Sequence, residues 1–319
     1  MDLSIVIPLY VSEKTIVPVV EELQQELACI HIENYEIILV NDCSPDNVLA
    51  VAKDIARQDK RIKIISLARN SGQMAALMTG YRHTSGKYIV SMDDDYQTPG
   101  NEIGKLIEKL EKDDLDVVFA YYPAQKQSRF RLFGSFVHYK MAEIMLDKPK
   151  GVRTNSFYIM RKFVRDEIVR YNNNYPYTYG IIFAITSKCG NVDTNHRHRM
   201  FGKSNHSFRK LVGMWLNGFL NFSTKPLRVS AFVGFIVAFF AAVGIIWTTI
   251  MRILNPEAPL GWASMIIAIL FFSGVQLVSI GLLGEYLGRL YVSVSKVPTT
   301  VVRETVNFSY EEEKANEGE

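Results

Sequence analysis

The sequence predicts an α/β domain with a mainly parallel sheet, followed by a transmembrane hairpin of two helices. Strand-like and helix-like segments alternate over the first 120 residues, an order that is typical of βαβ units. Further along the chain, residues 229–251 and 262–284 each contain no Asp, Glu, Lys or Arg. Each of these two segments is long enough to cross a bilayer.

The alternating elements can be placed in order along the chain. Runs rich in aliphatic and β-branched residues predict strands at residues 4–9, 36–40, 62–67, 87–92 and 116–120. Apolar residues at three- and four-residue spacing predict helices at residues 14–28, 47–58, 72–83 and 99–112. Two basic amphipathic stretches follow, at residues 129–145 and 208–222. Both patterns fit helices at a membrane surface, and both equally fit helices that pack on the sheet.

Basic residues around the two apolar segments predict how the hairpin is oriented. Lys225 and Arg228 precede the first segment, Arg289 and Lys296 follow the second, and the connection contains only Arg252. The positive-inside rule then places both termini in the cytoplasm. The expected parts are a cytoplasmic domain at residues 1–206, a juxtamembrane helix at 207–228, the hairpin at 229–288 and a cytoplasmic tail at 289–319.

Composition sets limits on the class of protein. The chain has 319 residues, 48% of them hydrophobic, and a formal net charge of +3, which leaves room for a soluble domain of about 200 residues beside the hairpin. Cys29, Cys43 and Cys189 are few, odd in number and without a pattern, which predicts a reducing compartment and neither a disulfide framework nor a zinc site. No basic stripe interleaved with aromatic residues is present, so we expect no nucleic-acid partner.

Three adjacent carboxylates, Asp93, Asp94 and Asp95, follow the fourth expected strand. The carboxyl ends of strands face the ligand crevice in an open α/β sheet, and alternate residues such as Asp93 and Asp95 can face the same hard cation. The sequence therefore predicts a Mg²⁺ or Mn²⁺ site that meets a diphosphate. The same residues also fit a solvated acidic turn before a helix that Thr98 caps and Pro99 begins.

Six short motifs, taken in order, resemble glycosyltransferase family 2, which has the GT-A fold and inverts the sugar it transfers. The resemblance is to the branch that glycosylates polyprenyl phosphates, which includes bactoprenol glucosyltransferases, aminoarabinose transferases and dolichyl-phosphate mannose synthases. The motifs are VIPLY from Val6, VNDCSPD from Val40, RNSGQ from Arg69, DDDYQTP from Asp93, RMFGKS from Arg199 and GLLGEYLGR from Gly281. Together with the hairpin they cover nearly the whole chain.

The resemblance implies a set of residues that bind the nucleotide sugar. These residues are Pro8, Tyr10, Asp42, Arg69, Gly72, Gln73, Asp93 and Asp94. Asp42 would accept a hydrogen bond from the imide N–H of uracil, which favours a UDP-linked sugar; alternatively, it forms an Asx turn with Ser44. Asp95 and Asp93 would hold the metal, and both belong with Arg199 to the expected catalytic group.

The resemblance also implies a polyprenyl-phosphate acceptor, expected to be undecaprenyl phosphate. Arg197, Arg199, Lys203 and Ser204 would bind its phosphate, since a guanidinium can bind two phosphate oxygens at once. The same basic loop could instead face anionic lipid. A lipid phosphate is already ionised at neutral pH, so its oxygen can attack the anomeric carbon without a strong general base.

Three positions depart from the pattern of the branch. Ser12 stands where relatives carry a Glu, and Glu13 comes one place later; Ser156 replaces an Asp near the sugar; and Asn205 replaces a Lys. These departures make a sugar other than glucose a reasonable expectation. A silent scaffold that binds nucleotide sugar and a processive polysaccharide synthase are the alternatives. The overall expectation is a homo-oligomer in the cytoplasmic membrane that serves cell-envelope glycan modification.

Overall fold

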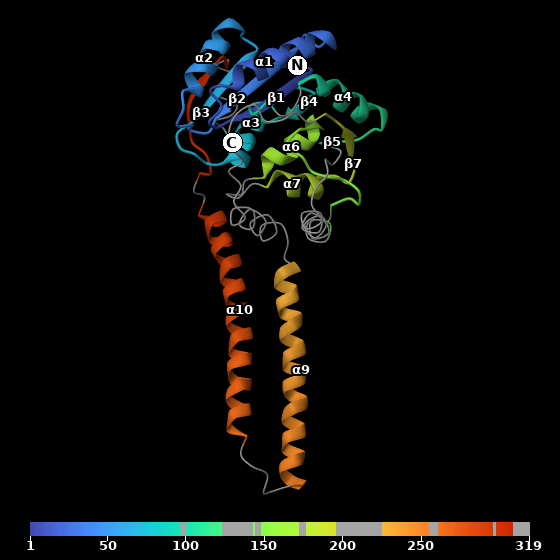
Figure 1. The fold of residues 1–319 in the computed structure, drawn as a ribbon, viewed down its shortest axis with the longest axis vertical. Helices are drawn as coiled ribbons and strands as arrows, with labels where there is room; N and C mark the ends of the chain where they lie inside the picture. The colour runs from blue at the N-terminus through green and yellow to red at the C-terminus, as the bar shows by residue number, and fades with distance from the viewer. Residues whose placement is uncertain are drawn as a thin grey trace. The chain divides into compact units, whose positions relative to one another are not determined.

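The chain divides into two compact units, which are Met1–Gly218 together with Pro298–Glu319, and Phe219–Val297. The structure is a computed structural model. It describes residues 1–96, 100–122, 143, 148–171, 177–195, 225–254, 261–295 and 298–308. Figure 1 shows the sheet and its helices, which form the first unit, and the two long helices of the second unit.

An eight-stranded sheet, in the order β7-β5-β6-β4-β1-β2-β3-β8, is the centre of the first unit. Its strands are β1 (Leu3–Leu9), β2 (Tyr35–Asn41), β3 (Ile62–Leu67), β4 (Tyr88–Ser91), β5 (Val117–Tyr121), β6 (Tyr158–Arg161), β7 (Cys189–Asp193) and β8 (Val302–Val306). Strand β6 runs antiparallel to β4 and β5, and β8 runs antiparallel to β3. The other neighbours pair in parallel, so the predicted mainly parallel sheet is confirmed.

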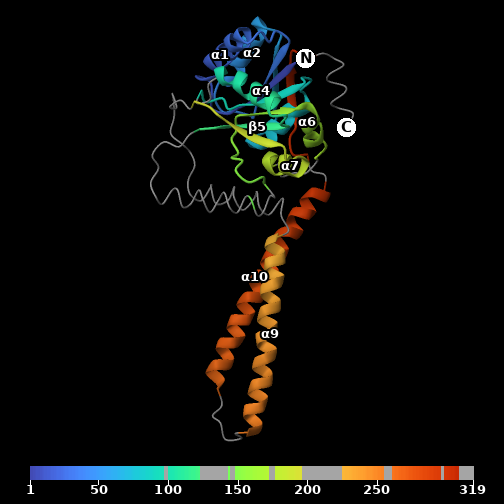
Figure 2. The same ribbon diagram turned by 90° about the vertical axis from the view of Figure 1, so that its right-hand side faces the viewer.

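Helices cover both faces of this sheet (Figure 2). They are α1 (Ile16–Cys29), α2 (Val48–Gln58), α3 (Gln73–Arg82), the short η1 (Gly100–Glu102) leading into α4 (Ile103–Lys112), α6 (Lys162–Arg170) and α7 (Thr178–Ile185). Helices α1, α2 and α4 share one core with the alternate residues of β1 that begin at Leu3. On the other face, α3 lies so close to the sheet that a Cβ at Gly80 would be 2.3 Å from Val6 Cγ1. Burial on both faces explains why the strands are almost continuously apolar.

Polar networks close the amino edge of the sheet, opposite the ends where parallel strands finish. The Glu36 carboxylate at the start of β2 accepts a hydrogen bond of 2.6 Å from Ser4 Oγ and one of 2.7 Å from the Ser85 N–H. Its other oxygen lies 3.0 Å from Lys63 Nζ, and the two side chains are only 0% and 9% exposed. This buried ion pair ties β2 to β3.

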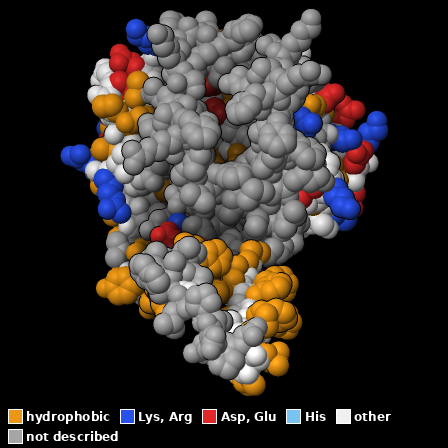
Figure 3. Space-filling view, turned by 60° about the horizontal axis from the view of Figure 1, so that its bottom comes forward, with side chains coloured by type: hydrophobic (Ala, Val, Ile, Leu, Met, Phe, Trp, Pro, Cys, Tyr) orange, Lys and Arg blue, Asp and Glu red, His pale blue; other side chains and the backbone are white. Residues whose placement is uncertain are grey.

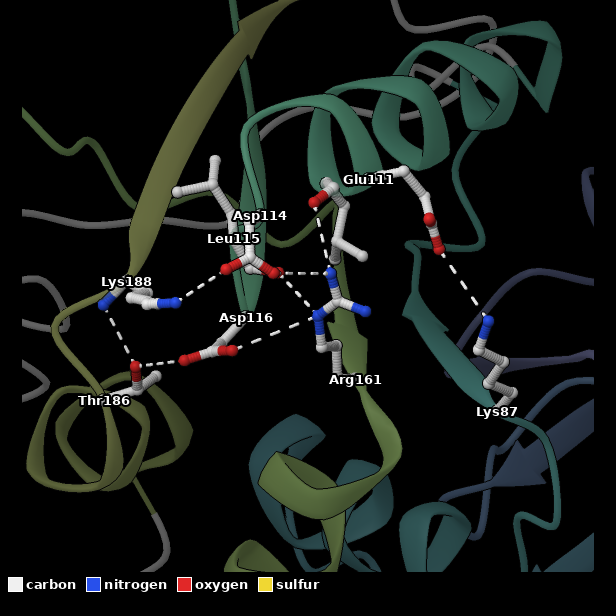
Figure 4. A network of polar contacts seen from close by, with 9 residues as sticks. Lys87, Glu111, Asp114, Leu115, Asp116, Arg161, Thr186 and Lys188 are labelled. Carbon is white, nitrogen blue, oxygen red and sulfur yellow. Dashed lines mark hydrogen bonds and ion pairs between the residues drawn. The ribbon is translucent and has the colours of Figure 1, made fainter.

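A second network joins β5, β6 and β7 at the same edge (Figure 4). Arg161, the last residue of β6, donates a hydrogen bond of 2.8 Å to the Leu115 carbonyl and lies 3.5 Å from Asp114. Asp114 also pairs with Lys188 at 2.8 Å, just before β7. Because these contacts hold the amino ends of the strands, the loops at the opposite edge remain as the place for a site.

The second unit is a pair of helices, α9 (Lys225–Leu254) and α10 (Trp262–Val294). Within the described residues, Leu227–Met251 and Phe271–Val294 are long and apolar enough to cross a membrane. Apolar side chains cover the outside of the helices (Figure 3), and Phe235, for example, is 77% exposed. So much exposed apolar surface requires an apolar environment around the hairpin.

Helix α10 extends ten residues beyond the predicted end of the second apolar segment. It continues through Glu285 and Arg289, whose side chains form an ion pair of 2.6 Å one helical turn apart. Pairing at this spacing allows two charged residues to extend the helix without a break.

The chain after α10 returns to the sheet, a feature that the sequence did not indicate. Residues Val302–Val306 form β8, which pairs with β3 at the edge of the sheet. The nearest features of the sequence are the motif that begins at Gly281 and the acidic residues near the end of the chain. Neither of them indicated a strand at residues 302–306. The two amphipathic stretches expected at residues 129–145 and 208–222 lie outside the described residues, except for Glu143.

The buried pair of Glu36 and Lys63 gives a prediction about stability. Replacing Lys63 by Met leaves the carboxylate buried without its cation, which should cost about 3 kcal/mol and lower the melting temperature by roughly 6–12 °C. Arg57→Gln removes an exposed ion pair with Asp54 and should change the melting temperature by less than about 2 °C. Circular dichroism of the protein in detergent measures both. Equal shifts in the two variants would contradict the importance of the buried pair.

Candidate functional site

Four adjacent parallel strands, in the order β4-β1-β2-β3, end at the same edge of the sheet. The loops that follow them carry Tyr10, Asp42, Arg69 and Asp93, and the segment that enters the antiparallel β6 brings Ser156 to the same edge. The sequence predicted the first four of these as site residues. Their convergence follows from the parallel order of the strands.

Asp42 binds the loop that follows the neighbouring strand β3. One carboxylate oxygen accepts a hydrogen bond of 2.7 Å from the Ser71 N–H, and the other accepts one of 2.8 Å from the Gly72 N–H. The side chain is buried, and burial raises its pKa, while these two hydrogen bonds oppose the rise. A carboxylate has about four lone-pair positions, so Asp42 can bind these amides and still accept a further hydrogen bond.

The Asx turn between Asp42 and Ser44, the alternative for Asp42, does not form. The Ser44 N–H donates a hydrogen bond of 3.2 Å to Asn41 Oδ1, three residues earlier, and the Ser44 hydroxyl accepts one of 2.8 Å from the Val11 N–H. The Asp42 carboxylate accepts from the β3–α3 loop instead.

Gly72 lies at the start of α3, as the sequence indicated. Its φ of 87° is in the left-handed region, where glycine carries no steric penalty. This conformation lets its N–H face Asp42 while its carbonyl accepts a hydrogen bond of 3.0 Å from the Ala76 N–H. Arg69, in the same loop, is exposed and donates a hydrogen bond of 3.2 Å to the Pro298 carbonyl. A guanidinium has five N–H donors, so this contact leaves others for a phosphate.

The first two carboxylates of the triplet bind different partners. Asp93 accepts a hydrogen bond of 2.7 Å from Gln73 Nε2 on one oxygen and a hydrogen bond from Ser156 Oγ on the other. Asp94 accepts a hydrogen bond of 2.9 Å from the Tyr10 N–H. The two carboxylates therefore bind different loops, and the expectation that Asp93 and Asp95 face the same cation stays a prediction.

Asp94 differs from its neighbours in its surroundings. Burial is the main reason that its pKa rises to about 6. The Ser12 hydroxyl and the Tyr10 N–H oppose this rise, and the charges of Asp93 and Asp95 add to it. The half-buried Asp94 carboxylate thus anchors the loop after β1, and its expected contact with the nucleotide sugar stays a prediction.

Two of the departures from the family pattern have structural roles. Ser12 is buried beside Asp94. Glu13 faces α2, where its carboxylate accepts a hydrogen bond of 3.2 Å from the Asn47 N–H at the start of that helix. Glu13 therefore caps α2. Ser156, the second of these departures, donates a hydrogen bond to Asp93. Asn205 lies outside the described residues.

Sequence reasoning missed an aromatic cluster near Asp93. Phe119 lies 5.3 Å from Tyr158 and 6.1 Å from Tyr179, measured between ring centroids. Burial raises the pKa of Tyr179 well above its usual value, and the charge of Asp93 contributes to the rise. The tyrosines in the segment Tyr175, Tyr177 and Tyr179 were the available signal, but their spacing matches no motif.

The carboxylates fit a metal ion that would also bind a diphosphate. Among the described residues, no three His, Cys, Asp or Glu side chains come together as a metal site. Magnesium, however, usually binds one or two carboxylates and takes its other ligands from substrate phosphates and water. Asp93 and Asp95 are carboxylates of this kind, and their assignment to a metal ion stays a prediction.

The expected acceptor residues, Arg197, Arg199, Lys203 and Ser204, lie outside the described residues. The preceding strand β7 ends at Asp193 on the carboxyl edge of the sheet. The acceptor assignment therefore stays a prediction.

Comparison with known proteins identifies the family of the chain. Residues 4–169 match glycosyl transferase family 2. The chain belongs to this family. Residues 225–290 match the GtrB C-terminal hairpin, so the family domain and the hairpin follow each other in this chain. This confirms the predicted enzyme class, a glycosyltransferase, and the GT-A type of α/β fold.

Similar proteins cover almost the whole chain. An undecaprenyl-phosphate 4-deoxy-4-formamido-L-arabinose transferase of Yersinia enterocolitica is 31% identical over 95% of this chain and 93% of its own length. A prophage bactoprenol glucosyl transferase homolog of Escherichia coli is 27% identical over 95% of this chain and 99% of its own. A solved structure of glucosyl-3-phosphoglycerate synthase from Mycobacterium tuberculosis has a TM-score of 0.49 and 17% identity, over 67% of this chain and 76% of its own.

The contacts of Asp42 give a prediction that does not depend on activity. In Asp42→Asn one oxygen becomes an NH₂ group, which cannot accept from the backbone, so one of the amides of Ser71 and Gly72 loses its acceptor. A hydrogen bond to a charged group contributes about 1.5–3 kcal/mol, so exchange of these amides with deuterium should accelerate by roughly 10- to 100-fold. Asn41→Ala, which removes the acceptor of the Ser44 N–H and a hydrogen bond of 3.1 Å to Ser66 Oγ but leaves the Asp42 carboxylate in place, is the control. Unchanged exchange at residues 71–72 in Asp42→Asn would contradict the role of this carboxylate.

Proposed function

We propose that the protein transfers a sugar, with inversion, from a nucleotide sugar to the phosphate of a polyprenyl lipid at the cytoplasmic face of the membrane. The donor is expected to be UDP-linked and the acceptor to be undecaprenyl phosphate. The observation that carries the proposal is the convergence of Asp42, Gln73, Asp93 and Ser156 at one sheet edge, in a chain that also has an apolar hairpin. A soluble acceptor would not require that hairpin.

The loops at this edge offer matched groups for the two halves of a nucleotide sugar. Asp42, with Pro8 and Tyr10 beside it, is suited to the base, because a carboxylate accepts from the imide N–H of uracil. Arg69 is suited to a phosphate, since its guanidinium is exposed at the start of the loop whose amides bind Asp42. The relatives that carry undecaprenyl phosphate and bactoprenol in their names support a polyprenyl acceptor.

The reaction needs positioning and neutralisation of charge more than proton transfer. An oxygen of the lipid phosphate forms a bond to the anomeric carbon, and the bond from that carbon to the diphosphate breaks, with its electron pair leaving on the diphosphate. The nucleophile is already ionised, so no side chain has to remove a proton. Asp93 and Asp95 would hold Mg²⁺ or Mn²⁺, which when bound neutralises the leaving diphosphate. Arg199 is proposed to hold the acceptor phosphate.

The contacts of Ser156 give the donor pocket a particular character. Its hydroxyl donates to Asp93, so this position supplies a neutral donor where the branch carries a carboxylate. The pocket therefore has one negative charge fewer beside the sugar. We infer that the sugar differs from glucose in its decoration.

Product mass tests the proposed function directly. The full-length protein in undecaprenyl-phosphate-containing membranes is incubated with a panel of nucleotide sugars, and the lipid is then weighed by mass spectrometry. A single sugar-phosphoryl-undecaprenol product, which needs added Mg²⁺ or Mn²⁺, is expected. Transfer to water or protein and none to lipid would contradict the acceptor assignment.

The metal assignment predicts unequal effects within the aspartate triplet. Asp95→Asn removes a charge that faces the cation, so transfer should fall on the order of 100-fold or more at saturating Mg²⁺. Asp94→Asn is the matched comparison, because that side chain instead anchors the Tyr10 loop. Near-normal turnover of Asp95→Asn, or an equal loss in both variants, would show that the wrong carboxylate was chosen.

The proposed topology places the catalytic domain and both termini in the cytoplasm. A reporter inserted after Pro256, between the two helices, should then appear on the outer side of the membrane, while one fused after Glu319 should stay inside. The physical reason is the excess of Lys and Arg that flanks the hairpin compared with the connection. Both reporters on one side would rule out a hairpin that spans the membrane.

A further inference from the structure

The segment that follows the second hairpin helix returns to the catalytic domain. Residues 298–308 include β8, which pairs antiparallel with β3 from Ile64 to Leu67. We call residues 298–308 the C-terminal strap. The strap belongs to the same compact unit as the sheet, and Pro298 follows the last turn of α10 by only a few residues.

The first residues of the strap contact the loop after β3, beyond the end of the paired strands. The Val301 carbonyl accepts a hydrogen bond of 2.8 Å from the Ala68 N–H, and the Pro298 carbonyl accepts one of 3.2 Å from the Arg69 guanidinium. The hydroxyls of Thr300 and Thr79 are 2.9 Å apart and share a hydrogen bond. The near end of the strap thus contacts both the loop and α3.

The far end of the strap is fixed separately, on α2 and on the amino edge of the sheet. Asn307 Nδ2 donates hydrogen bonds of 2.7 Å to the Ala56 carbonyl and 2.8 Å to the Ile62 carbonyl. Glu304 forms an ion pair of 2.8 Å with Lys53. These contacts can hold β8 on the sheet without any help from the near end.

The loop that the strap contacts is the loop that Asp42 binds. Ala68 and Arg69 are held by the strap, and two residues later the amides of Ser71 and Gly72 donate to Asp42. A five-residue loop fixed at both ends has little freedom to move. The orientation of Arg69 and the position of the two amides therefore depend on the strap.

We propose that the near end of the C-terminal strap is a positioning element for the nucleotide sugar, acting through the Ala68–Gly72 loop. Thr300 is its principal side chain, because its hydroxyl joins the strap to Thr79 of α3, the helix that follows that loop. This inference rests on the proposed function. The strap follows the second hairpin helix after only a few residues. A short stretch of chain therefore connects this helix to the strap that contacts the proposed donor pocket.

Protection of the sheet edge is the simpler role for such a segment. An uncovered edge strand exposes unpaired backbone groups and invites aggregation. Residues Val302–Val306 would already satisfy that need by pairing with β3. The contacts of Pro298, Thr300 and Val301 lie outside the strand, so edge protection does not require them.

A pair of strap variants separates positioning from simple stabilisation. Thr300→Val removes the shared hydrogen bond and keeps the shape of the side chain, and Thr300→Ser restores the hydroxyl. Asn307→Ala removes three hydrogen bonds at the far end, two to backbone carbonyls and one from Lys60 Nζ, and is the control. For each full-length protein, steady-state kinetics give KM for the nucleotide sugar, KM for undecaprenyl phosphate and kcat. Calorimetry gives the Kd of UDP, and circular dichroism gives the melting temperature.

Thr300→Val should raise the KM for nucleotide sugar and the Kd of UDP by about three- to tenfold, as the loss of one neutral hydrogen bond implies. The KM of this variant for undecaprenyl phosphate and its kcat should stay within about twofold of the wild-type values. Thr300→Ser should restore the wild-type KM for the nucleotide sugar. Asn307→Ala should lower the melting temperature at least as much as Thr300→Val does, and it should leave the KM for the nucleotide sugar unchanged.

Two results would overturn the role of the strap while leaving the proposed function standing. In the first, the wild type binds UDP and transfers sugar, and Thr300→Val binds UDP equally well. In the second, Asn307→Ala raises the donor KM as much as Thr300→Val does, which would reduce the strap to a stabilising strand. A wild type that binds no UDP and transfers no sugar would instead overturn the proposed function itself, and the role of the strap with it.

Discussion

Carboxylates at the ends of β2 and β4 hold together the loops on which the site of this glycosyltransferase depends. Asp42 accepts from two backbone amides of the β3–α3 loop, and Asp94 accepts from the Tyr10 N–H after β1. Asp93 is held from two sides by Gln73 and Ser156. Donors of this kind offset the repulsion among adjacent carboxylates. The same hydrogen bonds connect the loops that follow β1, β2, β3 and β4 with one another.

The chain combines this polar site with a hairpin of nearly continuous apolar helices. The hairpin has few polar contacts of its own among the described residues, and the hydrogen bond of 3.0 Å between Ser230 and Ser279 is one of them. A membrane supplies the apolar surroundings that such helices need. The C-terminal strap then carries the chain back to β3, so the hairpin is covalently joined to the domain at both of its ends.

Much of the fold could be predicted because its local signals agree with its tertiary structure. The first five strands begin and end within two residues of their predicted positions, since buried parallel strands are continuously apolar and helices between them are periodic. The loop residues Asp42 and Asp93 were identified from motifs at strand ends. Their convergence followed from the parallel topology.

The missed features depend on contacts between segments that are far apart in the sequence. Strand β8 is short, contains Arg303 and Glu304, and lies at a sheet edge, so it has no apolar run to mark it. The partner of Asp42 also could not be predicted, because its carboxylate meets amides about thirty residues away. In the sequence, Ser12 and Glu13 looked like a family motif shifted by one residue. In the structure, Ser12 is buried and Glu13 accepts a hydrogen bond from the Asn47 N–H. Such roles depend on loop conformation, which a single sequence does not specify.

Protection of Cys43 by nucleotide tests the central claim most directly. Cys43 is exposed and directly follows Asp42. In a protein that carries Cys29→Ser and Cys189→Ser, its rate of alkylation is measured in membranes with Mg²⁺, with and without UDP at a saturating concentration. If the carboxyl-edge loops form the nucleotide pocket, UDP should slow the alkylation at least about fivefold, and Asp42→Asn should weaken this protection. An unchanged rate at a UDP concentration that fully inhibits sugar transfer would place the nucleotide elsewhere and contradict the account.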